Sequence, residues 1–405
     1  MGPILPAVNE ELIKYFTDHF DWGLVRQRIT KDYITSLREN FFSDRISDCL
    51  EAIEELDGFV RCRELDDELR QKAIYVLRAA VFSSSSTEIV RVGALAFYEL
   101  LDTLREIVSD AERGDGLRQE AMYSLNFFAS KDSFLENEDL RESALTVLGG
   151  LIDALCEIVR ISGRDSYICI IAILSLGFIV SSDNIVHRTR ALEKLDGFVR
   201  CKSLGPNLRR KASKELNSYI SSTSDSEEAR AQALAVLCGL IDTFGEIVMG
   251  DILTGEGGEV FFRQEAILGL KRVVRYGEKT DRTRALKKLV GFLRSKEPYS
   301  ILLGTASNAL YTATHSDKYF VSEEARRQTL VELVGLADIY YAEAEVDSDL
   351  SDFFHDNTFL VLKYFASSDS EVVSEDVKKI AIEKLRVYKQ PRVITLEELY
   401  ARLNP

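Results

Sequence analysis

The stretch Leu56-Asp-Gly-Phe-Val-Arg-Cys62 recurs unchanged as Leu195-Asp-Gly-Phe-Val-Arg-Cys201, and a weaker copy stands at Leu289-Val-Gly-Phe-Leu-Arg-Ser295. Repetition of one motif within a chain of 405 residues indicates a tandem array rather than one compact enzyme domain. A unit of this size cannot bury its apolar face alone, so neighbouring units stack into a solenoid that presents an extended surface. We therefore predict a repeat protein that functions through its surface.

Each unit contains two helices with the template Arg-x-x-Ala-x-x-x-Leu, in which Ala and Leu share one helix face because they are four residues apart. The first helices place their small residue at Ala52, Ala94, Ala144, Ala191, Ala233, Ala285, Thr329 and Ala381. The second helices place it at Ala73, Ala121, Ala172, Ala212, Ala266, Ala306 and Thr358. Successive positions of the first series are 42, 50, 47, 42, 52, 44 and 52 residues apart. This spacing predicts seven helix pairs and one closing helix.

The leucine of each second helix is expected to fill the layer between helix pairs, while the small alanines allow the helices to approach closely. These leucines are Leu77, Leu125, Leu176, Leu216, Leu270, Leu310 and Leu362. The predicted fold class is all-α, a right-handed α-solenoid (superhelix) of about seven antiparallel helix pairs plus end caps.

The second helices also carry a family resemblance. Their sequences are similar to the Val-Arg-x-x-Ala-x-x-Ala-Leu signature of HEAT second helices, as in Glu68-Leu-Arg-Gln-Lys-Ala73, Gly116-Leu-Arg-Gln-Glu-Ala121, Asn207-Leu-Arg-Arg-Lys-Ala212 and Phe261-Phe-Arg-Gln-Glu-Ala266. From about residue 45 to 388 the chain resembles the HEAT and armadillo-like α-solenoid repeats. The resemblance implies the architecture and is nearly silent on activity. The arginine of the template is replaced in three repeats by Cys169, Leu303 and His355.

The ends of the chain differ from its middle. Residues 1–44 lack the template, so we predict N-terminal capping helices there and one continuous repeat array over 45–388. Pro391 then breaks the chain, and Thr395-x-x-Glu398 has the spacing of a capping box. Residues 389–405 are therefore expected to form a C-terminal cap with a short helix.

Cysteine usage and the N-terminal sequence bear on localisation. The six cysteines are scattered and form no Cys-x-x-Cys pair, which is typical of reduced core thiols in an intracellular protein. The first residues lack the basic region and the apolar run of a signal peptide. The uncharged run Tyr167–Val180 has the length of a buried helix and is too short for a membrane span. We expect an intracellular, cytoplasmic protein with no membrane partner, and the nucleus remains open as an alternative.

Motifs that carry chemistry are absent from the sequence. The four histidines are far apart and none stands in a metal-binding spacing, and neither a nucleophile elbow nor a phosphate-binding glycine loop occurs. The acidic stretch 343–356 lacks the glycine and the closing glutamate of a calcium-binding loop. We predict no catalytic, cofactor-binding or metal-ligating residues, and a protein that is not an enzyme.

Charge is unevenly distributed along the chain. The net charge is −15, yet residues 187–214 carry a local +7 and residues 271–296 a local +8. Two such segments could form one basic stripe that attracts phosphate or an acidic partner. The candidate partner-binding residues are Arg209, Arg210, Lys211, Lys214, Lys271, Arg272, Arg275, Lys287 and Lys288. Nucleic acid is the less favoured ligand, because the overall charge repels a long polyanion and no aromatic platform is interleaved with the basic residues.

The function predicted from these observations is a non-catalytic scaffold or adaptor that binds another protein on the solenoid surface. The alternative is a nucleic-acid-binding or nucleic-acid-processing HEAT-like protein that uses the basic segments 187–214 and 271–296. Periodicity places one row of second-helix residues at corresponding positions two residues after the small residue of each template. That row is Tyr75, Tyr123, Leu174, Lys214, Leu268, Asn308 and Leu360.

Overall fold

The computed structural model describes residues 31–40, 46–83, 87–130, 138–161, 166–221, 227–249 and 257–293, with isolated helical positions between 302 and 383. The chain divides into two compact units. The N-terminal unit comprises Met1–Ser162 and Ser166–His187, and the C-terminal unit comprises Gly163–Asp165 and Arg188–Pro405. Of the N-terminal cap predicted for residues 1–44 only 31–40 are described, and the C-terminal cap predicted for 389–405 lies outside the described residues.

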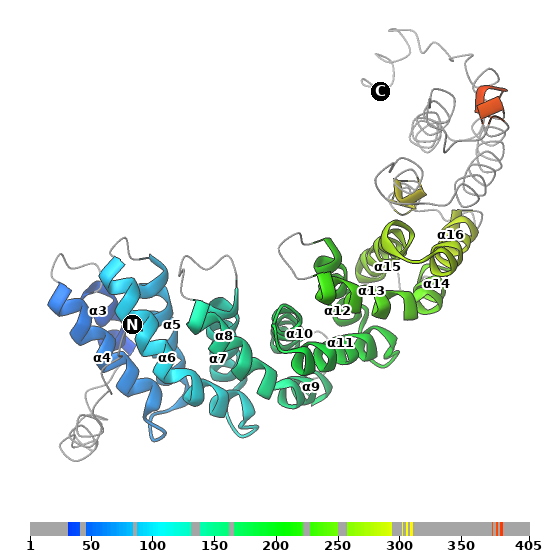
Figure 1. Cartoon of the computed structure of the whole chain (residues 1–405). Helices are drawn as coiled ribbons and strands as arrows, with labels where there is room; N and C mark the ends of the chain where they lie inside the picture. Colours follow the sequence, from blue (N-terminus) through cyan, green and yellow to red (C-terminus); the bar gives the residue numbers. More distant parts are fainter. Residues whose placement is uncertain are drawn as a thin grey trace, which may run out of the picture. The chain divides into compact units, whose positions relative to one another are not determined.

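The N-terminal unit consists of two layers of helices (Figure 1). Its helices are α3 (Lys31–Asn40), α4 (Ile46–Arg61), α5 (Asp67–Ser83), α6 (Thr87–Ser109), α7 (Asp115–Ala129), α8 (Glu138–Gly150), α9 (Ile152–Ile161) and α10 (Tyr167–Val180). The first-helix layer contains α4, α6 and α8 with α9, and each of these packs on the next. The second-helix layer contains α5, α7 and α10, and α3 packs against α5 at the start of this layer.

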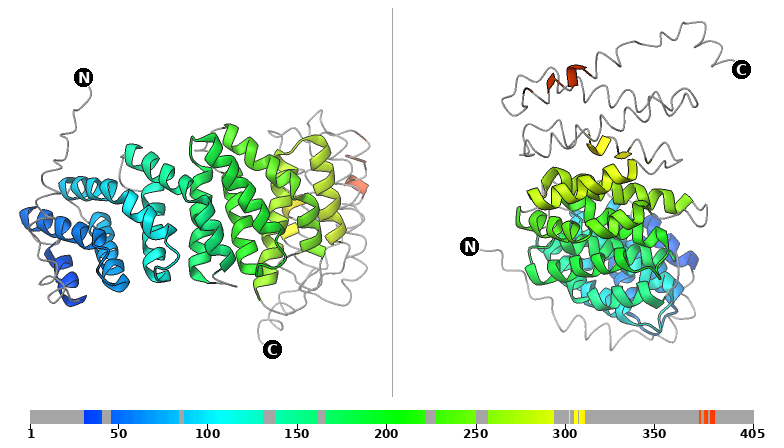
Figure 2. Two further views of the ribbon diagram at one scale, coloured as in Figure 1. Left: turned by 90° about the horizontal axis from the view of Figure 1, so that it is seen from below. Right: turned by 90° about the vertical axis from the view of Figure 1, so that its right-hand side faces the viewer.

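The C-terminal unit repeats the two-layer arrangement, and its helices lie side by side in both views of Figure 2. Its helices are α11 (Ile185–Arg200, whose first three residues belong to the N-terminal unit), α12 (Pro206–Ser221), α13 (Glu227–Gly239), α14 (Ile241–Met249), α15 (Gly257–Tyr276) and α16 (Lys279–Leu293). The first-helix layer contains α11, α13 with α14, and α16, and the second-helix layer contains α12 and α15, which pack on each other. No strand occurs in the described residues of either unit.

The alanine and leucine template forms the core, as predicted. Every described alanine of both series is at most 3% exposed, and every described leucine of the second helices is fully buried. The two remaining template threonines and Leu362 lie outside the described residues. The small side chains let helices of adjacent pairs approach, and the leucines fill the space between them. The fold is therefore an α-solenoid of stacked helix pairs.

The template arginine of the second helices has a structural role. Arg70 donates from Nε and a terminal nitrogen to the carbonyl oxygen of Val60 at 3.0 and 2.9 Å. The last carbonyls of a helix have no partner within that helix, so this guanidinium satisfies the end of α4 from the start of α5. Where Cys169 replaces the arginine, its Sγ lies 3.6 Å from the carbonyl oxygen of Ile158 and 4.0 Å from that of Val159.

Two first helices are broken in the middle, which the template did not predict. In the third and fifth repeats the chain bends after Gly150 and after Gly239, so that α8 is followed by α9 and α13 by α14. Helices α13 and α14 meet at an angle of 51°.

None of the described helices taken singly is long and apolar enough to cross a membrane, and among them only the bent pair of α13 and α14 reaches the required length and apolar content when the two are joined. Helix α10, which contains the uncharged run, has its residues Ile168, Cys169, Ile171 and Ala172 in the core.

Candidate functional site

The predicted row of second-helix residues lies on the outer side of the second helices, which is the side opposite their buried template alanines. Six members are described, namely Tyr75, Tyr123, Leu174, Lys214, Leu268 and Asn308, and none of them is buried. They remain accessible because each follows its buried template alanine by two residues, which turns the side chain to the opposite side of the helix. The seventh member, Leu360, lies outside the described residues.

In the N-terminal unit this side carries a continuous row of aromatic and cationic groups, which we call the tyrosine row: Tyr75, Arg78, Tyr123 and Tyr167. The Arg78 guanidinium lies 5.8 Å from the ring centroid of Tyr75 and 5.7 Å from that of Tyr123. The rings of Tyr123 and Tyr167 are 6.1 Å apart, and their hydroxyl groups are hydrogen-bonded. The row thus runs across α5, α7 and α10.

Ion pairing and burial fix the centre of the tyrosine row. Arg78 donates to Glu120 Oε1 from Nε at 3.0 Å and from a terminal nitrogen at 2.6 Å, which joins α5 to α7. Burial and the hydrogen bond with Tyr167 raise the pKa of Tyr123 to about 12, so its hydroxyl stays protonated at neutral pH. Tyr75 is 40% and Tyr167 55% exposed. Exposed tyrosines with ordered neighbours combine apolar contact area with a polar tip, which suits a protein interface.

The sequence contained a signal for the two members of the tyrosine row that the predicted row missed. Tyr167 precedes Leu174 by seven residues and Arg78 follows Tyr75 by three, and both intervals return to the same side of a helix.

The candidate basic residues on α12 have different roles. Arg209 donates from Nε to the carbonyl oxygen of Val199 at 3.0 Å and so repeats the contact made by Arg70, which identifies it as a structural residue. Arg210 lies 5.4 Å from the ring centroid of Phe261. Lys211 pairs with Glu215 at 3.0 Å, and the neighbouring candidate Lys214 is exposed.

The candidate basic residues on α15 stand close together. Lys271 donates to Asn308 Oδ1 at 2.8 Å, and the Arg275 guanidinium lies 5.0 Å from the ring centroid of Tyr276. Burial lowers the pKa of Lys271, and the nearby positive charges of Arg272 and Arg275 lower it further. Burial also lowers the pKa of Arg272. The cations of this helix therefore repel one another.

Lys287 and Lys288 belong to a different layer. Both lie on α16 in the first-helix layer, where Lys288 pairs with Asp242 of α14 at 3.0 Å. Arg284 donates to the same carboxylate at 2.8 Å. Hydrogen bonds from Lys288 and Arg284 lower the pKa of Asp242. The structure thus brings the candidates of α12 and α15 together and separates them from the two lysines of α16.

Aromatic rings do lie among the basic residues, so the sequence-based statement that none is interleaved was wrong. Besides Phe261 beneath Arg210, Phe262 has its ring centroid 4.7 Å from the Arg209 guanidinium. The two phenylalanines are on α15, about 50 residues from the arginines in sequence, and packing of α12 on α15 brings them together. Such cross-repeat proximity has no local sequence signal.

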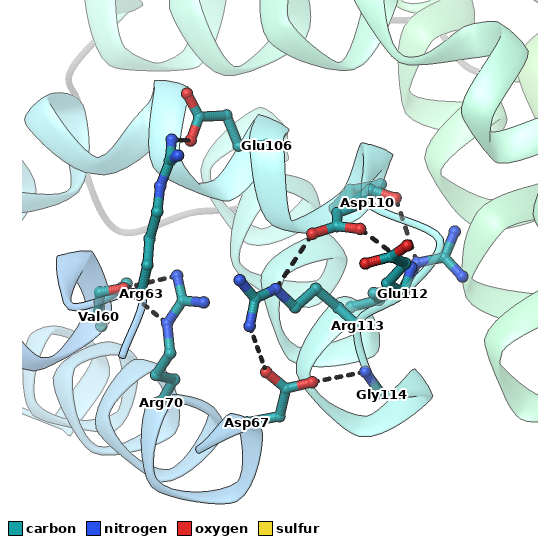
Figure 3. Close-up of polar contacts among 11 residues, drawn as sticks. Val60, Arg63, Asp67, Arg70, Glu106, Asp110, Glu112, Arg113 and Gly114 are labelled. Carbon is teal, nitrogen blue, oxygen red and sulfur yellow. Dashed lines mark hydrogen bonds and ion pairs between the residues drawn. The ribbon is translucent and has the colours of Figure 1, made fainter. Parts of the chain in front are cut away.

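A polar hollow of about 350 Å³ lies at one end of the first two repeats (Figure 3). It is lined by Arg63, Arg70, Glu106, Ile107, Ser109, Asp110 and Arg113. Asp67 accepts from the backbone nitrogen of Gly114 at 2.6 Å and from Arg113 at 3.3 Å. These bonds join the start of α5 to the turn before α7.

The groups of this hollow already satisfy one another. Arg63 pairs with Glu106, Arg113 with Asp110 at 3.1 Å, and Ser109 donates to the carbonyl oxygen of Arg105 at 2.9 Å. Arg63 and Arg113 pair with carboxylates, whereas Arg70 and the Ser109 hydroxyl donate to backbone carbonyls, so the polar groups of the hollow link adjacent repeats.

The described residues contain free thiols and no cluster of side chains suited to a metal ion. Within the described residues, no group of three or more His, Cys, Asp or Glu side chains is arranged to hold a metal ion. The cysteines are free thiols, and Cys49, Cys156 and Cys169 are buried.

Comparison with known proteins gives likenesses of structure. No family model matches the chain, and no curated protein matches it in sequence. A computationally designed armadillo repeat protein for modular peptide recognition is 14% identical, covers 64% of this chain and 98% of its own, and has a TM-score of 0.42. A circular tandem repeat protein is 14% identical, with 97% and 96% covered and a TM-score of 0.44. Kap121p bound to Pho4p is 14% identical, with 94% and 45% covered and a TM-score of 0.34.

The structure itself assigns the architecture. Paired helices, a buried alanine and leucine template and a recurring arginine contact define the described part of both units. The described part of the chain is an α-solenoid of stacked helix pairs.

Proposed function

We propose that the protein is a non-catalytic scaffold or adaptor that binds another protein along the outer side of its second helices. The tyrosine row is the observation that carries this proposal. Tyr75 and Tyr167 are large side chains left exposed, and Arg78, ordered by Glu120, lies against Tyr75 and Tyr123. Tyrosine and arginine are enriched among the residues that dominate binding energy at protein interfaces.

Order in the free protein supports the same function. Binding energy is lost when flexible side chains must be fixed, so a row that is already held by hydrogen bonds and ring contacts binds at lower entropic cost. The core beneath the row is closely packed, since Ala121 and Leu125 of α7 are fully buried. The surface is therefore largely preformed.

The test is affinity capture from the native lysate with matched variants. The chain offers a control in Tyr98, which is 51% exposed on α6 in the first-helix layer of the same unit. We expect a stoichiometric protein partner that is retained by Tyr98→Ala and lost by the double variant Tyr75→Ala/Tyr167→Ala. Equal retention by both variants contradicts the proposed surface.

The alternative function is examined in the same experiment. A nucleic-acid-binding protein would recover nucleic acid, seen as absorbance at 260 nm, and would release it steeply as salt is raised. Recovery of nucleic acid in place of a protein partner contradicts the scaffold proposal.

A further inference from the structure

We propose that the outer side of α12 and α15 binds an acidic segment of a protein partner. The surface consists of Arg210, Lys211, Lys214, Lys271, Arg272 and Arg275, and we call it the α12–α15 basic face. The proposal rests on the proposed function, since it takes the bound segment to belong to a protein. It adds the chemical class of the segment and a second surface, which lies within the C-terminal unit.

Positive charge predominates on the two helices that carry the α12–α15 basic face. Helices α12 and α15 contain eight Lys or Arg residues against Glu215, Glu259 and Glu265, a local excess of five positive charges in a chain of net charge −15. Of the carboxylates, Glu215 pairs with Lys211, while Glu265 lies next to Asn217. A surface with this excess attracts negatively charged segments of a partner protein.

The contacts of individual cations point the same way. Arg210 lies against the ring of Phe261, and Lys271 donates to the amide oxygen of Asn308, so both positive charges contact uncharged groups among the described residues. First-helix cations of this unit differ, because Lys288 and Arg284 share the carboxylate of Asp242. These two first-helix cations are thus already paired with a carboxylate.

Three cations stand within five residues of one another on α15. Burial lowers the pKa of Lys271, and the positive charges of Arg272 and Arg275 lower it further. A carboxylate of the bound segment placed beside these cations would form charge-assisted hydrogen bonds with them.

The dimensions of the surface indicate a short segment. Residues 261 and 275 of α15 are separated by about 21 Å along the helix axis at about 1.5 Å per residue. An extended peptide advances about 3.3 Å per residue, so about six residues cover the face. Phe261 is 48% exposed at the end where Arg210 lies, which adds apolar area for one hydrophobic side chain of the segment. We expect an acidic segment with an apolar residue at one end.

The experiment uses the full chain and a defined probe. The probe is a fluorescent peptide of about eight residues with one leucine followed by alternating Asp and Glu, and the matched control peptide carries Asn and Gln in their place. Anisotropy titrations are run at about 50 mM and about 150 mM salt, where the screening length falls to about 8 Å. An oligonucleotide of about eight deoxynucleotides is the third probe.

Two protein variants of equal charge change separate a specific surface from net charge. Arg210→Glu/Lys214→Glu/Lys271→Glu alters the basic face. Lys202→Glu/Lys279→Glu alters two exposed lysines elsewhere in the same unit, with Arg160→Glu added to match the third reversal. If the first variant does not fold by circular dichroism, Lys214→Gln/Lys271→Gln replaces it, with Lys202→Gln/Lys279→Gln as its control.

We expect the acidic peptide to bind, the amide peptide not to bind, and the basic-face variant to weaken binding at least about tenfold while the control changes it less than about twofold. Absence of binding, or equal weakening by both variants, overturns the proposal. Tighter binding of the oligonucleotide than of the peptide overturns it in favour of nucleic acid. Loss of peptide binding while the tyrosine row still captures a protein would refute only this inference, whereas peptide binding without any captured protein would refute the proposed function.

Discussion

Arg70 donates two hydrogen bonds to the carbonyl oxygen of Val60, at 3.0 and 2.9 Å, from a position that is only 2% exposed. The same ten-residue relationship joins Arg118 to Val108 at 3.2 Å and recurs in the fourth repeat. In these three repeats the contact ties the start of the second helix to the end of the first helix before it. It makes the template arginine part of the repeat architecture rather than of a binding site.

The first prediction concerns this contact. Arg70→Met removes the donor and keeps much of the apolar stem, so a buried carbonyl is left without a partner. The free energy of unfolding is expected to fall by about 2 kcal/mol. The control Arg63→Met removes an exposed ion pair with Glu106 and is expected to cost less than about 1 kcal/mol. Urea titration followed by circular dichroism measures both, and equal effects would contradict the structural role of Arg70.

Two glycines give opposite predictions for the same substitution. Gly197 lies in the last turn of α11 with no atom within 4 Å of an added Cβ, so Gly197→Ala is expected to stabilise by up to about 1 kcal/mol. An added Cβ at Gly269 would lie 2.5 Å from the buried ring of Phe244, so Gly269→Ala is expected to destabilise by about 1–3 kcal/mol. Thermal unfolding of the two variants measures the difference. A stabilised Gly269→Ala would show that α14 and α15 are not packed as closely as described.

The contact between Arg78 and Glu120 predicts coupling between adjacent repeats. The pair joins α5 to α7, and the Glu120 side chain is 9% exposed. A double-mutant cycle with Arg78→Met and Glu120→Gln is expected to give a coupling free energy of about 1 kcal/mol. Additive effects of the two substitutions would contradict a direct interaction.

The pKa values of two cysteine thiols are shifted in opposite directions, so the two thiols are expected to become reactive at different pH. The hydroxyl of Ser203, 3.1 Å from the sulfur of Cys201, lowers the pKa of that thiol below its usual value of 9.0. Burial, followed by the charge of Asp281, raises the pKa of Cys238 to about 12. Because the thiolate is the reactive form, iodoacetamide is expected to modify Cys201 at pH 8 well before Cys238.

Mass spectrometry of each cysteine across pH 7 to 10 gives the two profiles. The rate at Cys201 should level off at a lower pH than the rate at Cys238, which should still be rising at pH 10. Ser203→Ala should shift the Cys201 profile to higher pH. A Cys201 profile that does not respond to this substitution would contradict the hydrogen bond.

The core of this protein could be predicted from its sequence because it is encoded locally. Ala121 and Leu125 share one helix face through an interval of four residues, and the same interval recurs along the chain, so stacking and burial follow from periodicity. The unequal spacing of the repeats also has a local cause. The 42-residue intervals follow the short first helices α4 and α11, and the 50-residue interval follows the longer α6.

The binding surfaces were predicted only in part, because they depend on contacts between repeats. Sequence placed Tyr75 and Tyr123 at corresponding positions, but the position of Arg78 between them follows from packing of α5 on α7. Sequence also grouped Lys288 with Lys271 by charge alone. Lys271 lies on α15, a second helix, and Lys288 lies on α16, a first helix, so the two lysines belong to different layers.

The most direct test of the central claim is oxidative footprinting of the complex with the captured partner, read at individual tyrosines. In the free protein Tyr75, Tyr167 and Tyr98 are 40%, 55% and 51% exposed, so all three should be oxidised at comparable rates. We predict that the partner protects Tyr75 and Tyr167 on the second helices and leaves Tyr98 on α6 reactive. Protection of Tyr98 with unchanged oxidation of Tyr75 and Tyr167 would contradict binding along the second helices.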